Sequence, residues 1–122
     1  MKRCLFVDDS GVIRKVAKRI LTGPDMLVVE AGSGGEAMRL CMDEMPDYVL
    51  IDTGLPDMEP EELIRSIRSL IGHVQPRIAI CLTEMDVPAI MRAKRAGAHG
   101  YLLKPFNRSQ LLDSFRTLKA VA

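Results

Sequence analysis

The chain contains 122 residues, of which 48% are hydrophobic and 27% charged. This length fits one domain with its own core, and the longest apolar runs fall far short of the roughly 20 residues that a transmembrane helix needs. The net charge of +1 provides no overall field that would attract nucleic acid. We therefore expect a single domain over residues 1–122 without an output domain, and no binding to DNA or to a membrane.

The cysteines give an indication of the compartment. Cys4, Cys41 and Cys81 are an odd number, lie far apart and sit in apolar stretches, with no Cys-x-x-Cys pair or histidine cluster suited to zinc. We expect buried thiols in a reducing environment. The apolar segment 4–7, directly after the first three residues, is too short for the core of a signal peptide. The expected location is the cytoplasm.

Short apolar runs recur along the chain and predict five β-strands. Their near-continuous apolar character, without strict alternation, is typical of a parallel sheet that is covered on both faces. The runs lie at 4–7, 26–29, 48–51, 78–82 and 101–103.

Stretches with helical spacing lie between and after these runs. We expect helices over about residues 11–21, 35–44, 60–71, 87–96 and 109–120. Ser10 is a suitable N-cap for the first helix, and Cys41 and Met42 are expected on the buried face of the second. Pro60 suits the opening of the third helix, and Gly97 the end of the fourth. Alternating strands and helices predict an α/β fold with a doubly wound parallel sheet.

Polar side chains stand at the ends of four of the predicted strands. Asp8 and Asp9 follow the first strand, Asp52 the third, Thr83 the fourth and Lys104 the fifth; these are the candidate site residues. In such a sheet, ligands bind outside the carboxyl ends of the strands. We therefore expect these side chains to share one edge.

These residue types suit a cation and a phosphoryl group. Three neighbouring carboxylates repel one another unless a cation lies among them, and an all-oxygen ligand set favours Mg²⁺. A lysine ammonium and a threonine hydroxyl add donors for an oxyanion. A single aspartate at a strand end is more often a helix cap or a turn residue. Capping, however, explains neither the double aspartate nor the lysine that precedes Pro105.

The same residues carry a resemblance to a known family. Residues 6–10 (FVDDS), residues 50–56 (LIDTGLP), Thr83, Tyr101 and residues 104–106 (KPF) resemble the receiver domain of two-component response regulators, most closely its single-domain CheY-like members. The resemblance covers the whole chain, including the spacings from Asp9 to Asp52 and from Asp52 to Lys104. It implies a flavodoxin-like sheet with the strand order 2-1-3-4-5.

The resemblance implies a phosphoacceptor site with a metal ion. Asp52 would take a phosphoryl group from a sensor histidine kinase or a phosphotransfer protein, and so become a 4-aspartylphosphate. Asp8, Asp9, Asp52 and the backbone carbonyl of Gly54 would hold Mg²⁺. Beyond this phosphorylation of itself and its reversal, the protein would not be an enzyme.

The resemblance also implies a switch. Lys104, joined to Pro105 by a cis peptide bond, would pair with a phosphoryl oxygen. Thr83 would move its hydroxyl onto the phosphate, and Tyr101 would turn inward. The surface formed by the helix over 87–96, the strand over 101–103 and the last helix would then change for a downstream protein, such as the flagellar motor switch in chemotaxis.

Four positions depart from the usual pattern of the family. Gly54 stands where a larger side chain is common, and Pro60 stands where glycine is usual. After Thr83 the family prefers a small residue, whereas this chain has Glu84 followed by Met85. These changes leave the lifetime of the phosphorylated state open.

The basic residues of the helix over 87–96 leave two interpretations open. Arg92, Lys94 and Arg95 form either a solvated helix face or a contact for an acidic partner or an anionic nucleotide. The second interpretation leads to an alternative function, an adaptor that binds its partner without phosphorylation. A metal-dependent phosphatase is a further alternative, but such enzymes tend to need a second acid two residues after the nucleophile, where Gly54 lies.

Overall fold

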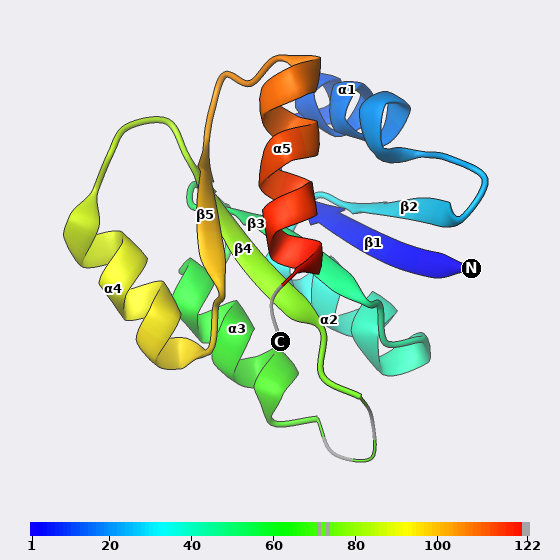
Figure 1. The fold of residues 1–122 in the computed structure, drawn as a ribbon. Helices are drawn as coiled ribbons and strands as arrows, with labels where there is room; N and C mark the ends of the chain where they lie inside the picture. The colour runs from blue at the N-terminus through cyan, green and yellow to red at the C-terminus, as the bar shows by residue number, and fades with distance from the viewer. Residues whose placement is uncertain (71, 73, 121–122) are drawn as a thin grey trace.

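The computed structural model describes residues 1–70, 72 and 74–120 and contains one parallel sheet (Figure 1). Its strands stand in the order β2-β1-β3-β4-β5, which confirms the predicted α/β fold. They are β1 (Lys2–Val7), β2 (Met26–Ala31), β3 (Tyr48–Asp52), β4 (Arg77–Leu82) and β5 (Gly100–Leu103). The helices of the described residues are α1 (Gly11–Leu21), α2 (Gly34–Asp43), α3 (Pro60–Arg68), α4 (Val87–Ala96) and α5 (Arg108–Lys119).

Each face of the sheet carries its own core. Because side chains alternate along a strand, neighbouring residues of β1 such as Leu5 and Phe6 belong to different clusters. One cluster includes residues of α2, α3 and α4, and the other includes residues of α1 and α5. Figure 1 shows the same division, with α1 and α5 on one side of the sheet. Burial on both faces explains the near-continuous apolar character of the strands.

The helix ends follow local signals in the sequence. The Ser10 hydroxyl accepts a hydrogen bond from the Ile13 amide (3.3 Å) and caps α1. Pro60 opens α3, and Gly97 follows α4 with a φ of 122°, a conformation that favours glycine. α3 ends at Arg68, three residues short of the expected end, and residue 71 lies outside the described residues.

One expected core residue is exposed. Met42 has 59% of its surface exposed, so its expected place on the buried face of α2 was wrong. The buried residues of this helix are Gly34, Ala37 and Cys41, which are three and four residues apart and therefore share one face. Met42 lies about 100° around the helix from Cys41 and faces solvent.

The cysteines are free and buried, as expected. Desolvation raises the pKa of the Cys41 thiol to about 11 and, as the largest cause, that of Cys81 to about 12, so both stay protonated at neutral pH. In the described ranges, no helix combines the length and the apolar character that crossing a bilayer requires.

Candidate functional site

Parallel pairing brings residues from β1, β3 and β5 to one edge of the sheet. Asp52 is the last residue of β3, while Asp8 directly follows β1 and Lys104 follows β5. The Asp8 amide donates to the Ala31 carbonyl (3.0 Å), and the Lys104 amide donates to the Leu82 carbonyl (2.6 Å). Backbone hydrogen bonds to the neighbouring strands therefore fix the positions of Asp8 and Lys104.

A buried lysine joins two buried carboxylates in this site. Lys104 Nζ lies 2.6 Å from Asp52 Oδ1 and 2.9 Å from Asp8 Oδ2, although the two aspartates are 44 residues apart in sequence. All three residues are buried. Desolvation lowers the pKa of Lys104, but hydrogen bonds and attraction from Asp52 and Asp8 outweigh it, so the pKa lies above its usual value. Lys104 is therefore a fixed positive charge at neutral pH.

Asp9 completes an acidic cluster that suits a hard cation. Asp8, Asp9 and Asp52 each offer a carboxylate oxygen, and these oxygens lie within 4.8 Å of one another. Mg²⁺ takes oxygen ligands, and these three oxygens are close enough together to hold one ion between them. The oxygen-only donor set and this spacing fit Mg²⁺.

The turn after β3 places Gly54 beside the same cluster. The Gly54 amide donates to Asp52 Oδ2 (3.2 Å), and a Cβ at residue 54 would stand 3.4 Å from that oxygen. The backbone of Gly54 thus lies against the phosphoacceptor candidate. The glycine also leaves this side of Asp52 open, because residue 54 carries no side chain to cover it.

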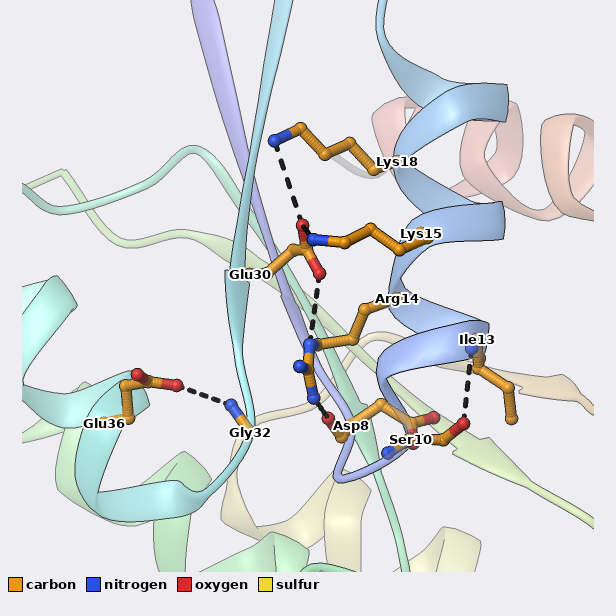
Figure 2. A network of polar contacts seen from close by, with 9 residues as sticks. All are labelled: Asp8, Ser10, Ile13, Arg14, Lys15, Lys18, Glu30, Gly32 and Glu36. Carbon is orange, nitrogen blue, oxygen red and sulfur yellow. Dashed lines mark hydrogen bonds and ion pairs between the residues drawn. The ribbon is translucent and has the colours of Figure 1, made fainter.

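A second set of contacts, which the sequence analysis did not predict, fixes the turn after β1. Arg14 Nη1 donates to the Asp8 carbonyl (2.6 Å), and Arg14 Nε donates to Glu30 Oε1 (3.1 Å), as Figure 2 shows. The Ser10 amide donates to Asp8 Oδ1 (2.9 Å). Arg14 belongs to α1 and Glu30 to β2, so only their relative placement in the fold reveals the pairing.

The expected switch residues lie outside the Asp8–Asp52–Lys104 cluster. Thr83 is exposed after β4 and lines an open cavity of about 620 Å³ together with Thr53, Glu84 and Met85. Tyr101 on β5 is 42% exposed and thus faces outward. The peptide bond from Lys104 to Pro105 is cis, as the resemblance implied.

The basic residues of α4 have different surroundings. Arg92 Nε lies 3.5 Å from Glu61 Oε1, so this arginine bridges α4 to α3. Lys94 and Arg95 are exposed. None of the three belongs to the acidic cluster.

Comparison with known families agrees with this geometry. A profile of the response regulator receiver domain matches residues 4–116, which is most of the chain. The chain belongs to this family. Receiver domains are signalling domains that work with histidine kinases or phosphotransfer proteins and with effectors, and they generally bind Mg²⁺ at an acidic pocket.

Individual receiver proteins are similar over different shares of their length. The chemotaxis protein CheY of Bacillus subtilis is 30% identical over 113 residues, an alignment that spans 92% of each chain. A protein-glutamate methylesterase/protein-glutamine glutaminase of Nocardioides is 38% identical over 107 residues, but the chain spans only 29% of that protein. The solved structure of the chemotaxis response regulator CheY4 of Vibrio cholerae superposes with a TM-score of 0.89 at 29% identity, covering 97% of this chain and 98% of that one.

Proposed function

We propose that this receiver domain accepts a phosphoryl group on Asp52 from a phosphohistidine of a sensor kinase or a phosphotransfer protein. The observation that carries the proposal is the placement of Asp52, a buried carboxylate that contacts Lys104 and shares a cation-sized cluster with Asp8 and Asp9. A carboxylate that served only as a helix cap or a turn former would have no need of a buried ammonium and two further acids.

The transfer forms one bond and breaks another. An oxygen of Asp52 bonds to phosphorus while the bond between phosphorus and the donor imidazole breaks, and the imidazole keeps the electron pair. An anionic carboxylate repels an anionic phosphoryl group, and the Lys104 ammonium offsets that repulsion at the point of attack. Mg²⁺ held by Asp8, Asp9, Asp52 and the Gly54 carbonyl would neutralise further charge on the phosphoryl oxygens.

The proposed output is a change of the surface formed by α4, β5 and α5. Phosphorylation replaces the single negative charge of the Asp52 carboxylate with a phosphoryl group of charge about −2. The Thr83 hydroxyl would be drawn to this group, and Tyr101 would then turn inward. Large apolar side chains are already exposed on this surface, which suits a protein partner. They are Val87, Met91, Tyr101 and Leu103.

The partner on this surface is proposed to be a protein of the chemotaxis system, such as the flagellar motor switch. The support is the similarity to CheY proteins over nearly their whole length. Lys94 and Arg95 would add contacts to acidic groups of the partner, with Arg92 next to them on α4. A cytoplasmic location is part of this proposal. An adaptor that works without phosphorylation is not favoured, because it gives no role to the buried Asp52–Lys104 pair.

Intact-mass spectrometry after incubation with acetyl phosphate and Mg²⁺ tests the proposal. The wild-type protein should gain one phosphoryl group, and Asp52→Asn should gain none. Asp43→Asn, which changes an exposed aspartate at the end of α2, is the matched control and should be labelled like the wild type. Labelling of Asp52→Asn, or labelling of the wild type that persists when EDTA removes the metal, would contradict the proposal.

A further inference from the structure

A network of charged side chains lies beside the acidic cluster, between α1 and β2 (Figure 2). Its centre is Glu30, whose side chain is only 14% exposed. Glu30 Oε1 accepts from Arg14 Nε (3.1 Å), and Oε2 accepts from Lys15 Nζ (2.8 Å), with Lys18 Nζ at 3.8 Å. Three cations thus lie around one partly buried carboxylate. The arrangement is a charge network and not an isolated ion pair on the surface.

Arg14 connects this network to the candidate metal site. While its Nε holds Glu30, its Nη1 donates to the carbonyl of Asp8 at 2.6 Å. The remaining polar atoms of Asp8 also have partners. They are the amide, which donates to Ala31, and the two carboxylate oxygens, which accept from Ser10 and Lys104. With the contact from Arg14 to the carbonyl, every polar atom of Asp8, in the backbone and in the side chain, has a hydrogen-bond partner.

We propose that Arg14 is a positioning residue for the cation site, held in place and neutralised by Glu30. The inference rests on the proposed function, because it concerns the Mg²⁺ that the phosphoryl transfer uses. Mg²⁺ tolerates little departure from octahedral geometry, so its affinity depends on how firmly the ligand carboxylates are fixed. Groups that orient metal ligands typically change affinity by about 10- to 100-fold when they are removed.

Glu30 has a separate electrostatic task in this arrangement. A guanidinium against the backbone of Asp8 brings a positive charge close to the place where a divalent cation would bind, and like charges repel. The carboxylate of Glu30 offsets that charge at 3.1 Å. The pair thus fixes Asp8 without opposing the cation. Removal of Glu30 alone should therefore weaken Mg²⁺ binding, although Glu30 contacts none of the three acids of the cluster in the described residues.

Lys15 provides a matched control on the same helix. It contacts the same carboxylate at 2.8 Å and carries the same charge as Arg14, but it is 69% exposed and its hydrogen bond is to Glu30, not to Asp8. Lys15→Gln therefore removes a positive charge and a Glu30 contact while the Arg14–Asp8 contact stays. Arg14→Met removes the contact with Asp8 and keeps a long apolar stem.

The test is a Mg²⁺ titration of the full chain, followed through the Gly54 amide by NMR spectroscopy. Arg14→Met should bind Mg²⁺ about 10-fold more weakly than the wild type, and Lys15→Gln should stay within about twofold. Arg14→Lys keeps the positive charge but lacks the planar guanidinium that contacts Asp8 and Glu30 at the same time. Its Mg²⁺ affinity should therefore lie between those of Arg14→Met and Lys15→Gln. In labelling by acetyl phosphate, Arg14→Met should need more Mg²⁺ for half-maximal rate and reach a plateau rate close to that of the wild type.

Each outcome decides the inference. Equal affinities of the wild type and Arg14→Met would overturn it, as would an equal loss in Lys15→Gln, because the loss would then follow helix charge and not the contact with Asp8. A wild type that binds no Mg²⁺ would overturn both this inference and the proposed function. Thermal unfolding without Mg²⁺ shows which variants are folded, and if Arg14→Met is not, Arg14→Lys and Glu30→Gln carry the comparison.

Discussion

The two sides of the candidate site differ in how firmly they are held. On the β1 side, all the polar atoms of Asp8 have partners, and Arg14 and Glu30 support them. On the β4 side, residues 83–88 are all exposed and border a cavity of about 620 Å³. In this segment of the described chain, Asp86 is the one residue whose side chain forms a hydrogen bond, and that bond caps α4.

This difference matches two tasks of a phosphorylation switch. A site that binds a cation and a phosphoryl group works best when its ligands are fixed before the reaction. A segment that responds to the charge of the phosphoryl group must be able to move, and segments that move usually lie in regions of low local stability. We therefore expect changes on the β1 side to alter affinity and stability, and changes on the β4 side to alter the response.

The largest effect on stability is expected from Lys104→Met. The change leaves Asp8 and Asp52 buried without their ammonium partner, and loss of one member of a buried ion pair costs about 3 kcal/mol or more. Urea denaturation at pH 7 without Mg²⁺ measures the loss, and added Mg²⁺ should restore part of it. Lys94→Met, on the exposed surface of α4, is the control and should stay within about 0.5 kcal/mol.

Asp9→Ala should have a smaller effect on stability and a clear effect on the metal. Asp9 is the exposed member of the acidic cluster, so its removal eases repulsion without leaving a buried charge unpaired. We expect Mg²⁺ to bind at least about 10-fold more weakly, which is about 1.4 kcal/mol, with the metal-free stability unchanged or slightly raised. A Mg²⁺ series of thermal unfolding midpoints measures both quantities. An unchanged dependence on Mg²⁺ would remove Asp9 from the metal site.

The Glu30 network should show itself in the pH dependence of stability. Lys15 and Arg14, with the charge of Lys18, hold the pKa of Glu30 below its usual value although desolvation opposes them. Since the pKa is lower in the folded state, the stabilisation is complete above the ordinary pKa of 4.5 and is lost as the pH falls through the folded value. At pH 7 the free energy of unfolding of the wild type should be about 1 kcal/mol higher than that of Glu30→Gln. This difference should disappear in acid. A constant difference down to pH 3 would contradict this.

The sequence predicted the tightly held part of the site better than its supports. Asp52 and Lys104 end up together because a doubly wound sheet brings the carboxyl ends of its strands to one edge, so strand ends alone predict the cluster. Arg14 and Glu30 could not be paired in that way. Both are charged residues in elements of mixed apolar and charged character, and their contact depends on how α1 packs across β2. Hydrophobic periodicity does not record that placement.

For the β4 side, the sequence predicted the functional residue but not the shape of the surrounding surface. Thr83 stands at a strand end and was expected there, whereas the cavity beside it depends on the path of residues 83–88, which no periodicity describes. The bridge between Arg92 and Glu61 likewise joins two helices that are neighbours only in the fold. Loop conformation and the relative placement of helices were thus the parts that needed coordinates.

The smallest effect on stability, and the sharpest test of the contrast, is expected from Thr83→Ala. Thr83 is exposed, so the change should alter stability by less than about 0.5 kcal/mol and leave labelling of Asp52 measurable. The response should nevertheless weaken, because the hydroxyl that would answer the new charge is gone. The shift of the Tyr101 amide in NMR spectra, with and without acetyl phosphate and Mg²⁺, measures that response. Thr53→Ala, on the wall of the same cavity, should keep the full shift, and an equally full shift in Thr83→Ala would show that the β4 side does not transmit the signal.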